Sequence, residues 1–201
     1  MSVAFQEATM LPAFAMPRRK LWTRAEVERM EKSGLLEGER LELIEGELIN
    51  KMGENRPHLN SVKLISMWLA SVFGSEFVMQ MQTIDVAPED NPTSQPQPDV
   101  SVLKESFLMF RSENPRPQDL HLVVEVSATT LYFDIRDKAR LYARAGIPEY
   151  WIANVQQRQL IVHREPQGGE YKSIRIYSES ESVAPLAAPD RELRVADAFP
   201  R

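Results

Sequence analysis

The sequence contains no cysteine in its 201 residues. This absence excludes a disulfide framework, a thiolate zinc site and a cysteine nucleophile, and it favours a location in the reducing cytoplasm. A basic excess is also absent, because 24 lysine and arginine residues stand against 29 acidic residues and leave a formal charge of −5. The composition therefore excludes proteins that bind nucleic acid through positive charge over their whole surface.

Long hydrophobic runs and internal repeats are missing as well. No apolar run approaches the 18 or so residues of a membrane span, so we expect no membrane partner. Residues 10–16 are apolar, but three basic residues follow them rather than precede them, which is the wrong order for a secretory signal. We expect a flexible tail over residues 1–17, one domain over residues 18–178 and an irregular C-terminal extension over residues 179–201, with a turn at 195–199.

The patterns that are present alternate between helix and strand. Thr23 and Glu26 have the spacing of a capping box, and Gly34 ends that first helical segment. Apolar residues at helical spacing predict further helices over 58–74 and 134–145. Strands are predicted over 40–44, 47–51, 77–86 with a bulge near residue 83, 99–103, 120–126, 149–155, 158–164 and 171–177. This order predicts an α/β or α+β domain in which helices flank a mixed central sheet.

Two carboxylates stand in unusual places. Glu125 lies inside the most hydrophobic strand, where an unpaired carboxylate costs several kcal/mol, so it needs a partner. That partner could be a loop or a buried arginine rather than a ligand. Asp99 follows a proline at the start of a short strand, where an aspartate is often only a turn residue. Neither residue alone predicts a site.

Lys138 is the third unusual residue, because it shares the apolar side of its predicted helix with Ile135 and Leu141. Taken alone, it is compatible with a lysine whose stem covers the core while its ammonium reaches water. The solvent-facing row of the same helix consists of Arg136, Arg140 and Arg144.

The three unusual residues together indicate chemistry. If the strands of Asp99 and Glu125 are neighbours, both carboxylates can reach one site that Lys138 can also enter. Two adjacent carboxylates repel each other, and Mg²⁺ or Mn²⁺ relieves that repulsion. Such an ion would polarise a phosphoryl oxygen, while Lys138 could orient a water or stabilise negative charge. The constellation predicts metal-assisted hydrolysis of phosphodiesters.

Five short segments occur in an order that resembles a known family. They are ELIEGEL, QPDV, EVS, DIRDK and GIPEYW. These motifs resemble the Uma-two (Uma2) family, bacterial proteins placed in the PD-(D/E)XK, restriction-endonuclease-like superfamily. The resemblance covers roughly residues 18–177 and implies a restriction-endonuclease-like nuclease core.

The resemblance implies a role for each unusual residue. Asp99 matches the aspartate of the PD motif and Glu125 the glutamate of the EV motif, and both would bind the metal ion. Lys138 matches a lysine that in this family is found on the following helix. Val126 and Ser127 follow Glu125, so the superfamily's usual lysine beside that glutamate is absent.

The resemblance also implies accessory residues. An upstream glutamate completes the metal shell in many members, and both Glu42 and Glu47 match it. Spacing does not decide between them, and either could be a solvent-facing strand residue. His58 matches a histidine of the family but also stands where a helix cap or surface residue is expected. Asp134 could orient the ammonium of Lys138 or cap its helix.

Two positions depart from the family pattern, because Ala128 stands where relatives often carry aspartate or proline and Asn154 where they often carry aspartate. No acidic side chain at these positions can shape this site. We interpret Tyr150 and Trp151 as core or subunit-interface residues rather than a base-stacking platform. The superfamily resemblance suggests a homodimer, for which we expect strand 149–155 to provide exposed contacts.

The resulting hypothesis is a magnesium- or manganese-dependent endonuclease that acts on DNA. Arg136, Arg140 and Arg144 form a confined basic face, which predicts weak, salt-sensitive DNA binding. A non-catalytic nucleic-acid-binding or scaffold protein that keeps the nuclease fold is the alternative, and hydrolysis of a smaller phosphoester is a third possibility. Binding of a divalent metal ion distinguishes the first two.

Overall fold

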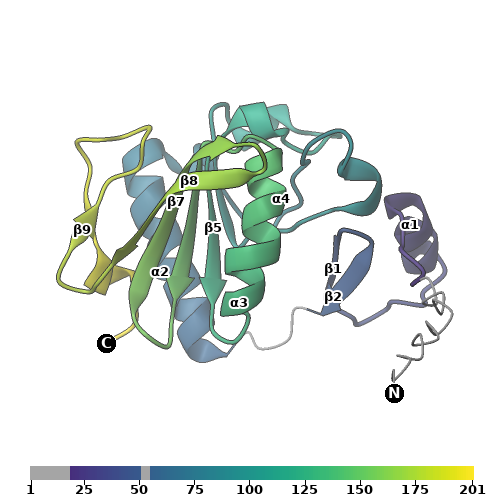
Figure 1. The fold of residues 1–201 in the computed structure, drawn as a ribbon, viewed down its shortest axis with the longest axis horizontal. Coiled ribbons are helices and arrows are strands. Elements are labelled where there is room, and N and C mark those ends of the chain that lie inside the picture. Colours follow the sequence, from purple (N-terminus) through teal and green to yellow (C-terminus); the bar gives the residue numbers. More distant parts are fainter. Residues whose placement is uncertain (1–18, 51–54) are drawn as a thin grey trace, which may run out of the picture.

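The computed structural model describes residues 19–50 and 55–201, so the expected tail over residues 1–17 lies outside it. A mixed sheet forms its centre (Figure 1), and its six strands follow the order β3–β4–β5–β6–β7–β8. The neighbours β5 and β6 are parallel, and the other neighbours are antiparallel. The strands are β3 (Val78–Gln80), β4 (Val100–Leu103), β5 (Leu120–Ser127), β6 (Glu149–Asn154), β7 (Gln159–Gln167) and β8 (Glu170–Tyr177).

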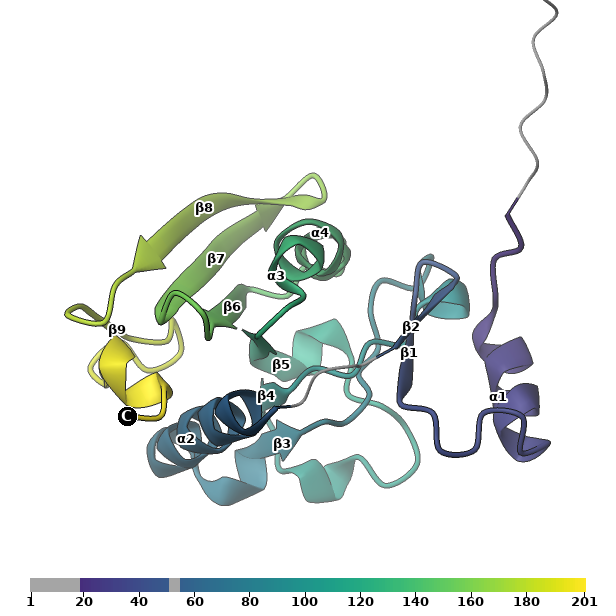
Figure 2. The same ribbon diagram turned by 90° about the horizontal axis from the view of Figure 1, so that it is seen from below.

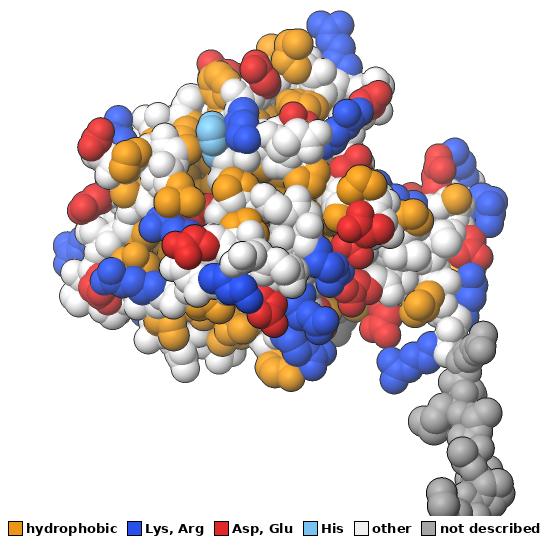
Figure 3. All heavy atoms as spheres, turned by 45° about the horizontal axis from the view of Figure 1, so that its top comes forward, with side chains coloured by type: hydrophobic (Ala, Val, Ile, Leu, Met, Phe, Trp, Pro, Cys, Tyr) orange, Lys and Arg blue, Asp and Glu red, His pale blue; other side chains and the backbone are white. Residues whose placement is uncertain are grey.

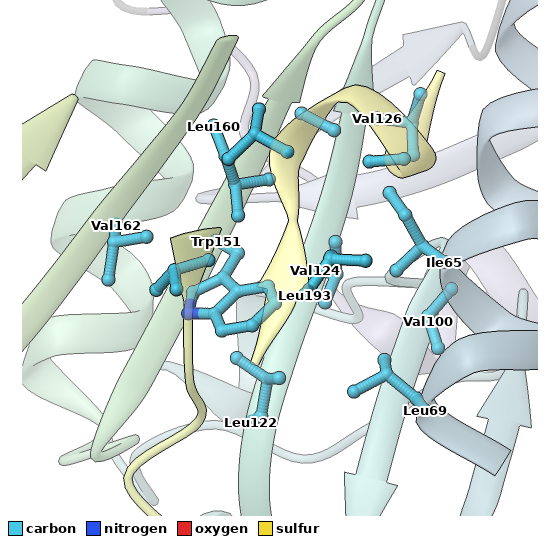
Figure 4. Packing of buried hydrophobic residues seen from close by; sticks show 14 of the residues in the cluster. Ile65, Leu69, Val100, Leu122, Val124, Val126, Trp151, Leu160, Val162 and Leu193 are labelled. Atoms are coloured by element: carbon cyan, nitrogen blue, oxygen red, sulfur yellow. The ribbon is translucent and has the colours of Figure 1, made fainter. Parts of the chain in front are cut away.

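Helices cover both faces of this sheet (Figure 2). On one face lies α2 (Arg56–Phe73), whose Ile65 and Leu69 point toward Val100 and Val124 of the sheet (Figure 4). On the other face lies the crossover helix between β5 and β6, which consists of α3 (Leu131–Phe133), a π-helical turn (Asp134–Lys138) and α4 (Ala139–Arg144). The predicted mixed sheet with flanking helices is confirmed. In the part of the chain that the structure describes, no helix is both long and apolar enough to cross a membrane.

The N-terminal elements stand beside the sheet (Figure 1). They are α1 (Arg24–Lys32), which has the predicted capping box of Thr23 and Glu26, and the hairpin of β1 (Leu41–Ile44) and β2 (Glu47–Asn50). A β-bridge joins Leu43 of the hairpin to Gln95 in the loop before β4, and the backbone N–H of Gly46 donates a 2.7 Å hydrogen bond to the carbonyl of Thr93 in the same loop. The predicted strand end at Lys51 lies outside the described residues.

The C-terminal segment contributes to the core on the α2 side. It forms β9 (Ser182–Val183), β10 (Leu193–Arg194) and a 3₁₀ turn (Val195–Ala198), the last close to the predicted turn. Val183, Leu193 and Phe199 are buried in the cluster that also contains Trp151. The segment predicted to be irregular thus covers one side of the sheet.

Two local predictions are wrong. The strand expected over 77–86 ends at Gln80, because Met81 has a φ of 50° and turns the chain out of the sheet; Ile84 is buried without belonging to a strand. The third helix begins at Leu131 and contains the π-helical turn. The extra residue in that turn changes the angular positions of side chains around the helix axis. Ile135, which lies in the turn, is therefore 39% exposed and does not share the apolar side of the helix with Lys138.

The predicted roles of the β6 region differ in their outcome. Tyr150 and Trp151 are completely buried, so they belong to the interior. The expectation that residues 149–155 provide exposed dimer contacts is wrong, because β6 lies between β5 and β7 and all six of its residues are buried. By contrast, the predicted turn between the last two strands is confirmed, since Gly168 and Gly169 have φ angles of 63° and 79° that favour glycine.

His163 gives the fold a testable pH dependence. It lies between Tyr150 and Tyr171, and burial lowers its pKa from 6.5 to about 4. The folded state therefore favours neutral His163, while the unfolded chain takes up a proton near pH 6.5. The stabilisation that comes from keeping His163 neutral is complete above pH 6.5. As the pH falls to 4, the free energy of unfolding declines by up to about 3 kcal/mol.

His163→Phe removes this titration while keeping an aromatic ring at the site. Urea unfolding at several values between pH 7 and pH 4 should show that the free energy of unfolding declines less for the variant than for the wild type. If the free energy of unfolding depended on pH in the same way in both proteins, His163 would not be the source of this pH dependence.

Candidate active site

Glu125 and Asp99 lie on neighbouring strands and on the same face. Side chains alternate along β5, so Val124 and Val126 face α2 whereas Glu125 faces the crossover helix. Antiparallel pairing places Val100 of β4 opposite Val124, and Asp99 directly precedes Val100. Asp99 thus reaches the face that Glu125 occupies, and its Oδ2 accepts a 2.7 Å hydrogen bond from the backbone N–H of Val126.

Lys138 reaches this pair from the end of the π-helical turn. Such turns occur frequently at functional sites. A pocket of about 60 Å³ opens between the turn and the sheet. Six ionisable residues line it, and all are at most 7% exposed: Glu42, His58, Asp99, Glu125, Asp134 and Lys138. The three residues that break the sequence pattern are therefore brought together.

Two carboxylates hold the Lys138 ammonium. Its Nζ lies 2.8 Å from Oε1 of Glu125 and 2.8 Å from Oε1 of Glu42. Burial alone lowers the pKa of Lys138, but the carboxylates of Glu125, Glu42 and Asp134 outweigh it and hold the pKa well above its usual value. Lys138 is therefore a fixed cation at neutral pH and not a proton acceptor.

His58 faces Asp99 from the first turn of α2. Its Nε2 lies 3.3 Å from Oδ2 of Asp99. His58 is not the helix cap, because Asn55 caps α2 by accepting a hydrogen bond from the His58 backbone N–H. It is not a surface residue either, because its side chain is buried. His58 is thus placed where it can orient the Asp99 carboxylate.

The two candidate glutamates of the hairpin differ in burial and in their partners. Glu42 of β1 is buried in the pocket, where Oε1 contacts Lys138 and Oε2 accepts a 3.3 Å hydrogen bond from the backbone N–H of Gln97. Glu47 of β2 is exposed and forms an ion pair with Arg19 at 3.2 Å. Of the two, Glu42 faces the site.

Asp134 lies inside the crossover helix and not at its N-cap, which is Thr130. Its Oδ2 accepts a 2.7 Å hydrogen bond from the Thr130 hydroxyl. Burial raises the pKa of Asp134, while Lys138 and the hydroxyls of Thr130 and Ser127 oppose that shift. Asp134 adds a third carboxylate to the surroundings of Lys138.

The predicted row of arginines divides in two. Arg136 and Arg140 are exposed, as expected of a solvent-facing row. Arg144 instead binds Asp90 at 2.9 Å and Glu45 at 2.6 Å, so it links α4 to the hairpin and the loop before β4. Figure 3 shows basic and acidic side chains interspersed over the face that it presents, in keeping with the net charge of −5.

One residue of the site escapes sequence reasoning. The hydroxyl of Tyr142, completely buried, donates a 2.8 Å hydrogen bond to Oε1 of Glu125. Burial, with the charges of Glu125 and Glu42, raises its pKa well above the usual value and keeps it protonated. Its position one helical turn after Lys138 is the signal that could have identified it.

Of the two positions that depart from the family pattern, Ala128 lines the pocket, whereas the Asn154 side chain forms hydrogen bonds with Gln157 in the turn after β6.

The donor chemistry of the pocket fits a hard divalent cation. Within residues 19–50 and 55–201, no three histidine, aspartate or glutamate side chains are grouped so as to enclose an ion by themselves. Mg²⁺ does not require such a group, since it commonly keeps several waters and takes one or two carboxylates. Asp99 and Glu125 supply two carboxylates beside a space that can admit water.

Comparisons with known proteins identify the family and the fold of this chain. No curated protein matches the chain. Among solved structures, the chain is similar to the crystal structure of "a putative nuclease belonging to DUF820 from Anabaena variabilis", with a TM-score of 0.65, 16% sequence identity, and coverage of 88% of this chain and 97% of that one. The family model Uma2, described as "Putative restriction endonuclease", matches residues 24–196. The chain therefore belongs to the Uma2 family and has a nuclease-like fold.

Proposed function

We propose that this protein is a metal-dependent DNA endonuclease that hydrolyses phosphodiester bonds at the pocket between β4, β5 and the crossover helix. The observation that carries the proposal is the meeting of Asp99, Glu125 and Lys138, from three separate elements, at one buried pocket. Each of them is an ionisable side chain that is at most 5% exposed. Membership of a nuclease family supports the same reaction class.

Asp99 and Glu125 would hold Mg²⁺ or Mn²⁺. When bound, the ion supplies polarisation of a phosphoryl oxygen and lowers the pKa of a coordinated water. The Val126 N–H and His58 orient the Asp99 carboxylate, while Lys138 orients that of Glu125. The protein thus presents both carboxylates in fixed directions, which favours a preorganised site.

Lys138 would stabilise the negative charge that develops on the phosphate. Its ammonium is held by Glu125 and Glu42, so it acts electrostatically and takes no proton from water. Because both oxygens of Glu42 contact donors of the protein, we assign Glu42 to holding Lys138 and not to binding the metal ion.

The DNA backbone would lie against the exposed Arg136 and Arg140, whereas Arg144 serves as a structural link. Two arginines on an acidic protein give weak binding that falls steeply with salt. We further propose a homodimer in the cytoplasm, since cleavage of both strands would use two such sites and the chain has no cysteine.

Nicking of supercoiled plasmid DNA tests the reaction. We expect nicked circles with Mg²⁺ or Mn²⁺, none with a chelator, and a rate that declines between 50 and about 200 mM salt. Calorimetry should show binding of Mg²⁺ or Mn²⁺. If neither ion binds even with DNA present, the endonuclease is ruled out in favour of a non-catalytic nucleic-acid-binding protein. Turnover of nucleotides without DNA binding would indicate a smaller phosphoester.

A further inference from the structure

Oxygen Oε1 of Glu125 accepts two hydrogen bonds from one helix. The Lys138 ammonium and the Tyr142 hydroxyl both lie 2.8 Å from it. Lys138 ends the π-helical turn and Tyr142 stands four residues later in α4, so consecutive turns of the helix aim a charged donor and a neutral donor at the same atom.

We propose that Tyr142 is a positioning residue, which fixes the orientation of the Glu125 carboxylate for metal binding. The inference rests on the proposed function, because it assumes that Glu125 holds the ion. The torsion of a glutamate carboxylate about its last bond is broad, so one donor leaves the plane of the group free to rotate. A second donor from a different direction removes that freedom.

The surroundings of Tyr142 leave its hydroxyl little freedom. The side chain is completely buried, and its ring packs edge-on against the ring of Tyr150, with centroids 5.0 Å apart and an interplanar angle of 73°. The hydroxyl therefore cannot exchange Glu125 for water, and a phenylalanine would fill the same space without the donor. Partners that orient a metal-binding side chain typically contribute 10–100-fold to metal affinity or activity.

Tyr142→Phe tests the proposal, with Tyr171→Phe as the matched control. Tyr171 is also buried, and its hydroxyl donates a 2.9 Å hydrogen bond to the backbone carbonyl of Ile147, away from the pocket. Both variants lose one buried hydroxyl, so a purely structural effect should be similar in the two. Binding of Mn²⁺ alone is measured from the electron paramagnetic resonance signal of the free ion, alongside plasmid nicking and thermal unfolding.

We expect Tyr142→Phe to weaken Mn²⁺ binding and to slow nicking, each by 10–100-fold in line with other positioning residues, while Tyr171→Phe stays close to the wild type. Wild-type affinity for Mn²⁺ in Tyr142→Phe, or equal losses in both variants, would overturn the positioning role. A wild-type protein that binds no Mn²⁺ and nicks no DNA would instead overturn the proposed function on which the role rests.

Discussion

Glu125→Gln is expected to reduce plasmid nicking by about 100-fold or more at saturating Mg²⁺. Glutamine keeps the shape of the side chain and an oxygen that accepts from Tyr142 and Lys138, but it removes the charge. A metal ion contributes several kcal/mol to the stabilisation of a developing charge, and each 1.36 kcal/mol corresponds to a factor of ten in rate. If Glu125 holds the metal ion as proposed, loss of its charge therefore outweighs any small change in packing.

Glu192→Gln is the control for this experiment, because Glu192 is exposed in the C-terminal segment and the substitution removes the same charge from the surface. It should nick DNA at the wild-type rate. Circular dichroism checks that Glu125→Gln is folded. If folded Glu125→Gln nicked DNA at a rate within a few-fold of the wild-type rate, Glu125 would not belong to the active site.

Lys138→Met is expected to destabilise the protein by about 3–5 kcal/mol in urea unfolding at pH 7, the usual loss when one partner of a buried ion pair is removed. The Lys138 ammonium is the direct ion-pair partner of both Glu42 and Glu125, and all three side chains are at most 4% exposed. Methionine fills much of the volume but leaves two buried carboxylates facing each other.

Two further variants separate this electrostatic effect from packing. Lys172→Met breaks an exposed pair with Glu170 and should cost less than about 1 kcal/mol. The double variant Lys138→Met/Glu125→Gln restores the net charge that the three groups have in the wild type, so it should recover part of the lost stability. A double variant less stable than Lys138→Met alone would show that the cost arises from lost packing.

Sequence patterns identify Asp99, Glu125 and Lys138 because each contradicts the local preference of its strand or helix. The position of Glu42 was not predictable, because Glu42 and Glu47 stand on paired strands of one hairpin and only the docking of that hairpin decides which of them is buried. Tyr142 was missed because a tyrosine on an apolar helix face does not differ from an ordinary core residue, and only its place one turn after Lys138 distinguishes it.

The fold shows the same division between local and tertiary effects. Most helices and strands follow from periodicity, yet the early end of β3 depends on the positive φ of Met81, a residue with no particular preference for it. The π-helical turn could not be predicted from the sequence either. It accompanies the burial of Asp134 and Lys138, two ionisable residues, in the pocket, and that burial depends on the tertiary structure.

The C-terminal segment has a consequence for how the chain matures on the ribosome. Val183, Leu193 and Phe199 complete the core beneath α2, and all three follow β8, the last strand of the central sheet, along the chain. During translation this part of the core stays uncovered after every strand of the central sheet has been made. Until the segment over residues 183–199 has left the exit tunnel, the nascent chain therefore carries an apolar surface that chaperones can bind.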